Sequence, residues 1–236
     1  MGDFLDKDIL LEMKNIHKSF PGVYALNAVD FKLRAGEVHA LIGENGAGKS
    51  TLIKVLGGIY PADQGEIFIN GKKVEIKGVK SAQDNGISII HQELVLVPHM
   101  TVAENIFLGR EPGRGKFVDQ SKMHDDAQEL LDAHGMKIHA RTLVGKLTIA
   151  QQQMVEIVKA ISYRSKILVM DEPTSSLSEK EVRFLFKTMR ALAEKGVGII
   201  YISHKMSELE EVCNRVTVMR DGLRNSCFRV KPPMSL

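Results

Sequence analysis

Short runs of apolar residues recur along the chain at intervals that suit buried β-strands. They read VHALI, ISII, ILVM, GIIYI and VTVM, at residues 38–42, 87–90, 167–170, 198–202 and 216–219. An uninterrupted apolar run of this length is typical of a strand covered on both faces, as in a parallel sheet. We therefore predict an α/β fold with a mostly parallel sheet.

Helical periodicity is clearest in the segment after residue 178. Its apolar positions would share one helix face: Val182, Leu185, Phe186, Met189, Leu192 and Ala193. Ser178 and Glu181 have the spacing of a capping box, and Gly196 supplies a stop signal. This pattern predicts an amphipathic helix.

Two other regions depart from the strand and helix alternation. Residues 9–16, 24–33 and 65–71 are strand-like and separated by turn residues, which predicts a small N-terminal antiparallel layer beside the parallel sheet. Residues from about 101 to 162 are mainly helical, which predicts an inserted helical subdomain. We expect one domain over residues 1–222 that includes this insert.

Composition narrows the class of protein. The chain has 236 residues, 44% hydrophobic and 26% charged, as in an ordinary soluble domain. The net charge of +3 comes from the tail after Gly222, which holds Arg224, Arg229 and Lys231 and no acid. Basic and acidic residues are equal in number in the rest of the chain, so the sequence shows no basic face for nucleic acid. We therefore expect no nucleic-acid partner.

Location can also be predicted. The two cysteines, Cys213 and Cys227, are too few for a disulfide framework and indicate a reduced, intracellular chain. The first ten residues are acidic where a signal peptide would be basic. No apolar run approaches the roughly 18 residues that a spanning helix needs. Any membrane role is therefore expected to be peripheral.

The segment GENGAGKST directly follows the predicted strand VHALI and precedes an apolar segment, LIKVL, that we expect to be helical. It fits the P-loop pattern, in which glycines let successive N–H groups face a polyphosphate at a helix N-terminus. Lys49 is expected to reach the β and γ phosphates and Ser50 to ligate Mg²⁺. The expected loop residues are Gly43, Glu44, Asn45, Gly46, Ala47, Gly48, Lys49, Ser50 and Thr51.

Polar candidates follow other predicted strands. Asp171 and Glu172 end the ILVM run, where the first could hold Mg²⁺ and the second could polarise an attacking water. His204 and Gln92 follow the GIIYI and ISII runs. Open α/β sheets bind ligands at the carboxyl edge of their strands. Together with Lys49 and Ser50 of the P-loop, Asp171 and Glu172 favour nucleotide hydrolysis rather than nucleotide binding alone.

Five motifs in this order resemble the ATP-binding subunits of ABC transporters, from about residue 9 to 222. They are GENGAGKS, HQE (91–93), LTIAQQQMVEI (147–157), ILVMDEPTSSLS (167–178) and ISHK (202–205). The resemblance implies a P-loop fold of the RecA-like kind. It also makes Gln92 the Q-loop glutamine, residues 147–151 the signature, residues 176–178 the D-loop region, His204 the switch histidine and Phe20 the aromatic that stacks on adenine.

More narrowly, segments such as KSFPGVYAL, ISIIHQEL and FVDQSKM resemble the first half of double-length ATPases for bacterial monosaccharide import, most closely the galactose/methylgalactoside type. That likeness implies several partners: transmembrane permease subunits, a second nucleotide-binding domain and, indirectly, a periplasmic sugar-binding protein. It places the chain at the cytoplasmic face of the membrane. Residues 223–236 match neither a linker nor the usual next strand, so we expect a truncated or frame-shifted tail.

The signature segment departs from the family pattern LSGGQ. Thr148, Ile149 and Ala150 replace serine and two glycines, and Ser178 stands where the D-loop aspartate is usual. Thr148 retains a hydroxyl, but β-branched Ile149 restricts close backbone approach. The P-loop face therefore looks competent, whereas the face offered to a partner looks compromised.

Two other functions stay open at this point. One is an ABC-type ATPase with no membrane partner, for which the sequence offers neither a basic arm nor a long coiled-coil insertion. The other is a nucleotide-binding regulatory half that never completes a catalytic site. The transported sugar is not readable from this chain.

Overall fold

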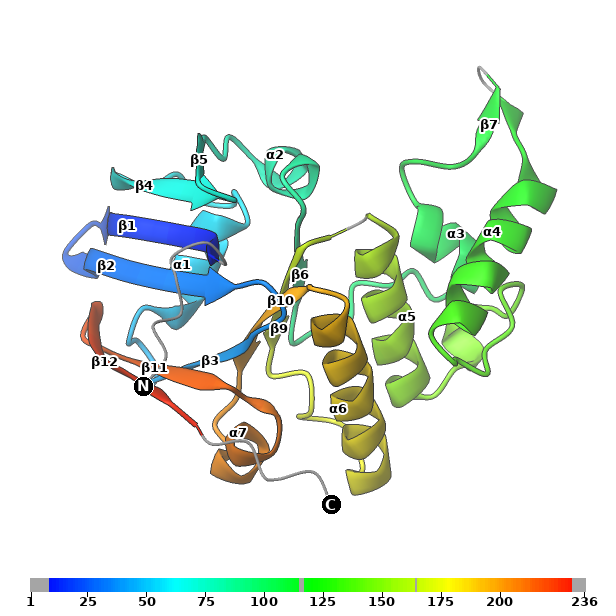
Figure 1. Cartoon of the computed structure of the whole chain (residues 1–236). Coiled ribbons are helices and arrows are strands. Elements are labelled where there is room, and N and C mark those ends of the chain that lie inside the picture. Colours follow the sequence, from blue (N-terminus) through cyan, green and yellow to red (C-terminus); the bar gives the residue numbers. More distant parts are fainter. Residues whose placement is uncertain (1–8, 115–116, 164, 231–236) are drawn as a thin grey trace. The chain divides into compact units, whose positions relative to one another are not determined.

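The structure is a computed structural model that describes residues 9–114, 117–163 and 165–230 (Figure 1). The chain forms two compact units. The first unit comprises residues 1–89, 165–172 and 189–236, and the second comprises residues 90–164 and 173–188. The long helix α6 (Glu179–Glu194) begins in the second unit and ends in the first.

A six-stranded sheet is the main element of the first unit (Figure 1). Its order is β12-β11-β3-β10-β9-β6. The strands are β3 (Val38–Ile42), β6 (Ile87–Ile90), β9 (Ile167–Asp171), β10 (Gly198–Ile202), β11 (Arg215–Arg220) and β12 (Leu223–Arg229). Strands β9, β10, β3 and β11 run parallel, and every residue of β10 is buried. The predicted parallel sheet of apolar strands is confirmed.

The predicted antiparallel layer is also present in the first unit. Its order is β2-β1-β4-β5. The strands are β1 (Ile9–Phe20), β2 (Val23–Arg34), β4 (Gln64–Ile69) and β5 (Lys72–Val74), and the helices of this unit are α1 (Lys49–Leu56), α2 (Val79–Asp84) and α7 (Met206–Val212). Leu11, Phe31, Leu56 and Ile200 share one apolar core that joins the two sheets and α1.

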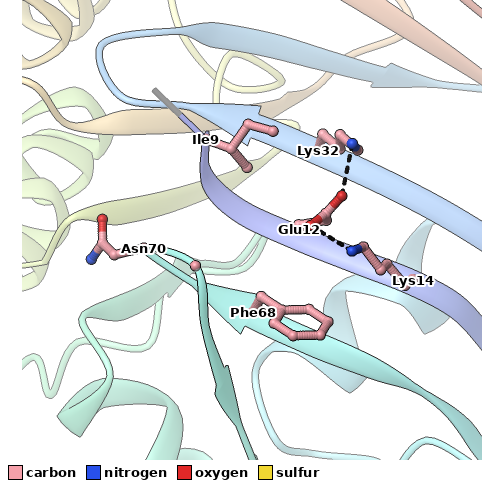
Figure 2. A pocket seen from close by; sticks show the side chains of 7 residues that line it. Ile9, Glu12, Lys14, Lys32, Phe68 and Asn70 are labelled. Atoms are coloured by element: carbon pink, nitrogen blue, oxygen red, sulfur yellow. Dashed lines mark ion pairs between the residues drawn. The ribbon is translucent and has the colours of Figure 1, made fainter. Parts of the chain in front are cut away.

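An open pocket of about 480 Å³ lies against strands β1, β2 and β4 (Figure 2). The Glu12 carboxylate lies 2.7 Å from Lys32 Nζ and 3.1 Å from Lys14 Nζ. The hydrogen bond from Lys32 is the main reason that the pKa of Glu12 is lowered. Lys14 Nζ also lies 4.8 Å from the centre of the Phe68 ring. These contacts link three neighbouring strands, so we assign them to the sheet surface.

The second unit is mainly helical. Its elements are α3 (Val102–Phe107), the short strands β7 (Gly113–Arg114) and β8 (Phe117–Val118), α4 (Gln120–Ala133), a 3₁₀ turn (Val144–Lys146), α5 (Ile149–Ser162) and the start of α6. Residues 101–162, the predicted helical subdomain, lie within this unit. Among the residues described, none of the helices combines the length and apolar character needed to cross a bilayer.

The expected truncated or frame-shifted tail, residues 223–236, begins with a strand over residues 223–229. They form β12, which pairs antiparallel with β11. Asp221 and Gly222 make the turn, with φ of +52° and +73°. Asp-Gly suits such a two-residue hairpin because both central residues need positive φ. Residues 231–236 of the tail lie outside the described residues, as do residues 1–8 of the predicted domain.

Candidate active site

The loop after β3 is built around three glycines with positive φ. Gly43, Gly46 and Gly48 have φ of 154°, 87° and 100°. A Cβ on Gly43 would lie 2.3 Å from the Met219 carbonyl oxygen, and one on Gly48 would lie 2.6 Å from that of Ala25. A Cβ on Gly46 would have no neighbour within 4 Å. The loop is therefore packed against its own fold at both ends and open at its middle.

Helix α1 begins directly after this loop. Its N-cap is Gly48, which has no side chain to cap the first amides, and Leu52 N–H donates to the Gly48 carbonyl at 2.9 Å. Ser50 is exposed in the first turn. Uncapped amides and the helix dipole favour an anion at this end.

Lys49 connects the loop to the acid pair. Its side chain is buried, and Nζ donates to the carbonyl oxygens of Gly43 at 2.6 Å and Glu44 at 3.0 Å. Burial lowers the pKa of Lys49, while the nearby charges of Glu172 and Asp171 act in the opposite direction. The charges of both carboxylates therefore act on the ammonium group that the loop carries.

The acid pair ends strand β9. Asp171 is paired with Ile202 of β10, and Glu172 N–H donates to the Ile202 carbonyl at 3.0 Å. Glu172 has φ of +47°, which is uncommon for a residue with a side chain and typical of functional positions. Its Oε1 lies 2.8 Å from His204 Nε2. A carboxylate and an imidazole from neighbouring strands thus meet at the carboxyl edge of the sheet.

The segment that carries His204 is held by Glu208, a residue that the sequence analysis did not identify. The buried Glu208 Oε2 accepts hydrogen bonds from Tyr201 Oη and Ser203 Oγ, both at 2.7 Å. Glu208 Oε1 lies 3.2 Å from Lys205 Nζ. The only sequence signal is an acid in the first turn of α7, which the helix dipole explains equally well.

The family model described as ABC transporter matches residues 26–175 of this chain, a range that includes the loop and the acid pair. The chain belongs to this family. The resemblance drawn from the five motifs is therefore confirmed.

Several relatives of this ABC transporter chain carry sugar-import names. It is 54% identical over 217 residues to the galactose/methyl galactoside import ATP-binding protein MglA of Clostridium perfringens (strain SM101 / Type A), covering 92% of this chain and 42% of that protein. The corresponding protein of Salmonella typhimurium (strain LT2) is 53% identical, with 91% and 42% covered. The chain thus spans less than half the length of these relatives.

Solved structures agree on the fold. A nucleotide-free ATP-binding cassette from an ABC transporter superposes with a TM-score of 0.84 at 27% identity, covering 94% of this chain and 92% of that one. A cassette in its ADP conformation gives 0.83 at 27% identity, with 94% and 91% covered. The predicted fold class is confirmed.

Phe20, the expected adenine-stacking residue, is a surface aromatic at the end of β1 and not a core residue. The residue is 37% exposed, and its ring packs edge-on against Tyr60 with 5.2 Å between ring centres. Asp63 fixes the neighbouring backbone, because its carboxylate accepts from Lys18 Nζ at 2.6 Å and from Ser19 N–H at 2.7 Å. The Lys18 bond is the main cause that lowers the pKa of Asp63 to about 2.

The remaining motif residues lie in the second unit. Gln92 is exposed and follows β6. Thr148 caps α5, its Oγ1 accepting from Gln151 N–H at 3.3 Å while Gln151 Oε1 accepts from Thr148 N–H at 3.0 Å. Ile149, at the start of α5, is 49% exposed. Ser178 donates its N–H and Oγ–H to Glu181 Oε2. The N–H bond is the one that the glutamate side chain accepts in a capping box.

The first unit contains side-chain oxygens of the kind that Mg²⁺ binds. Among the described residues, no group of three or more His, Cys, Asp or Glu side chains is arranged to hold a metal. Mg²⁺ does not need such a cage, since it commonly takes one or two protein oxygens together with phosphates and waters. The exposed Ser50 hydroxyl and the Asp171 carboxylate, which acts electrostatically on Lys49, are donors of this kind.

Proposed function

We propose that this chain binds MgATP at residues 43–51 and hydrolyses it, as the nucleotide-binding component of an ABC transporter that imports galactose, methyl galactoside or a related monosaccharide. One observation carries the catalytic part. The charges of Glu172 and Asp171 act to raise the pKa of Lys49 in the loop, and Glu172 lies 2.8 Å from His204. A phosphate-binding loop, a carboxylate base and a histidine therefore share one sheet edge.

Each residue has a role in this proposal. Lys49 and the amides of Gly43, Glu44, Asn45, Gly46, Ala47, Gly48, Ser50 and Thr51 bind the phosphates, and Phe20 stacks on the adenine. Ser50, Asp171 and Gln92 would hold Mg²⁺, which neutralises phosphate charge when bound. Glu172 takes a proton from water as the water oxygen bonds to the γ-phosphorus. The bridging P–O bond then breaks and ADP leaves, while His204 orients Glu172 and the γ-phosphate.

Transport requires partners that this chain does not contain. The names of the relatives support an import role, from which we propose transmembrane permease subunits, a second nucleotide-binding domain and, indirectly, a periplasmic sugar-binding protein. No nucleic acid is involved. The chain would act as a peripheral subunit at the cytoplasmic face of the membrane.

The second nucleotide-binding domain would supply a sound signature segment to the nucleotide site of this chain. Thr148, Ile149 and Ala150 replace the small, flexible residues of the family pattern. We propose that the partner's signature closes over residues 43–51 and that this chain offers a weaker site in return. Closure would expel water and strengthen charge stabilisation around the transferred phosphoryl group.

Two measurements test the function. ATPase activity is measured against chain concentration, where a steep rise supports closure of two domains and MgATP binding without turnover at any concentration supports a regulatory half. The tagged chain is then purified from detergent-solubilised membranes, and its partners are identified by mass spectrometry. Import is supported if the chain is recovered with a permease and galactose stimulates the ATPase activity of that complex. Recovery with ribosomes alone contradicts it.

A further inference from the structure

We propose that the β11–β12 turn, made by Asp221 and Gly222, is a positioning element of the nucleotide site, and that Gly222 is the residue on which it depends. The hairpin holds the backbone of residues 43–51 through the close approach of Met219 to Gly43 and the hydrogen bond from Gly222 to Ala47. This inference rests on the proposed function only for its nucleotide readout, because the contacts themselves involve protein backbone alone.

The turn is joined to the loop and to strand β2 by main-chain hydrogen bonds. Gly222 N–H donates to the Ala47 carbonyl at 3.3 Å, and Asn27 N–H donates to the Gly222 carbonyl at 2.8 Å. Gly222 thus bridges the middle of the loop to β2. It is buried, although it lies at the tip of a hairpin.

Close backbone approach continues on both sides of this bridge. A Cβ on Gly43 would meet the Met219 carbonyl oxygen at 2.3 Å. A Cβ on Gly48 would meet the Ala25 carbonyl oxygen at 2.6 Å, and one on Gly222 would meet the same oxygen at 3.0 Å. Three glycines therefore let the loop, the hairpin and β2 pack together without side chains between them.

This packing matters because the loop itself is glycine-rich. Glycine allows more backbone conformations than any other residue, so a free loop of this composition would lose much entropy on ordering its amides around phosphates. A rigid hairpin behind the loop lowers that cost before the ligand arrives. Residues 223–229, which do not match the family's usual next strand, contribute to this support because β12 pairs with β11 to form the hairpin.

The chain contains a matched turn that lacks these contacts. Asn70 and Gly71 join β4 to β5 with φ of +50° and +72°, nearly the values of +52° and +73° at Asp221 and Gly222. A Cβ on Gly71 would meet nothing within 4 Å, and Gly71 borders the open pocket of Figure 2. Alanine at either position meets the same backbone strain, but only at Gly222 does it also press on β2 beside the loop.

The test compares Gly222→Ala with Gly71→Ala in the full chain. Affinity for a fluorescent ATP analogue with Mg²⁺, the melting temperature, and amide hydrogen exchange of a peptide covering residues 43–51 are measured. We expect both variants to lose melting temperature because the φ strain is shared, and Gly222→Ala to lose more because its Cβ presses on β2. Only Gly222→Ala should bind the analogue about tenfold more weakly and exchange faster in the loop peptide.

Equal affinity and equal loop exchange in the two variants would overturn the proposal. If Gly222→Ala does not fold, Gly222→Asn and Gly71→Asn replace the pair, because asparagine tolerates positive φ and leaves only the added side chain. If the parent chain does not bind the analogue, the proposed function fails, and hydrogen exchange still decides whether the hairpin fixes the loop.

Discussion

His204 Nε2 lies 2.8 Å from Glu172 Oε1, although the two residues are far apart in the sequence. Glu172 follows β9 and His204 follows β10, which are neighbours in the sheet and run parallel. The contact therefore follows from strand order. It gives the carboxylate a partner that can orient it toward a bound phosphate.

Replacing the proposed base should separate binding from chemistry. We expect Glu172→Gln to bind MgATP within about threefold of the parent and to hydrolyse it roughly 10²–10³-fold more slowly, because an amide cannot accept the proton. Glu179→Gln, on the exposed start of α6, is the control and should keep parental turnover. Single-turnover phosphate release measures the hydrolysis rate of both variants, and titration with MgATP measures their affinity. Parental hydrolysis by Glu172→Gln would exclude Glu172 as the base.

Removing the ammonium group should weaken binding itself. We expect Lys49→Ala to lower MgATP affinity about 10- to 100-fold, as loss of a charge-assisted hydrogen bond to phosphate would. The control is Lys80→Ala, an exposed lysine on α2. Isothermal calorimetry gives both affinities, and unchanged binding by Lys49→Ala would remove the loop from the proposed site.

Glu208 should act on catalysis through His204. We expect Glu208→Gln to lower kcat about tenfold with little change in MgATP affinity, since a loosened Ser203 and Lys205 would let the imidazole move away from Glu172. In a His204→Ala background the same substitution should cost nothing further. Glu211→Gln, an exposed change on the same helix, is the control. Equal losses in both backgrounds would mean that Glu208 does not position His204.

His39 should make the fold sensitive to acid. Burial, followed by the charge of Arg215, lowers the pKa of His39 from its ordinary 6.5 to about 3. Its ring contacts the Lys32 carbonyl and Thr217 Oγ1, both at 2.8 Å.

The unfolded chain therefore binds a proton that the folded chain does not between about pH 6.5 and about pH 3. Stability that is present above pH 6.5 should be lost on acidification through this window, by at most about 1.4 kcal/mol per pH unit. Urea unfolding at about pH 7.5 and about pH 5 measures the loss. We expect it to be smaller in His39→Gln, and an identical loss would contradict the assignment.

Much of this molecule is readable from local sequence. Buried parallel strands need apolar side chains on both faces, so the apolar runs VHALI and GIIYI are enough to predict two buried strands. The P-loop pattern is equally local, because glycine spacing and the following helix start lie within nine consecutive residues, 43–51. The order of the motifs is enough to identify the family.

Long-range packing decided the rest. Asp221 and Gly222 carry a hairpin signal, but only the folded chain brings Gly222 against Ala47. Glu208 looks like an ordinary acid at a helix start until Tyr201 and Ser203 are seen to donate to it. Such contacts join residues through strand order and burial, which no spacing along the chain encodes. The sequence by itself therefore determined the elements and the family, and the tertiary structure determined which residues hold the site in place.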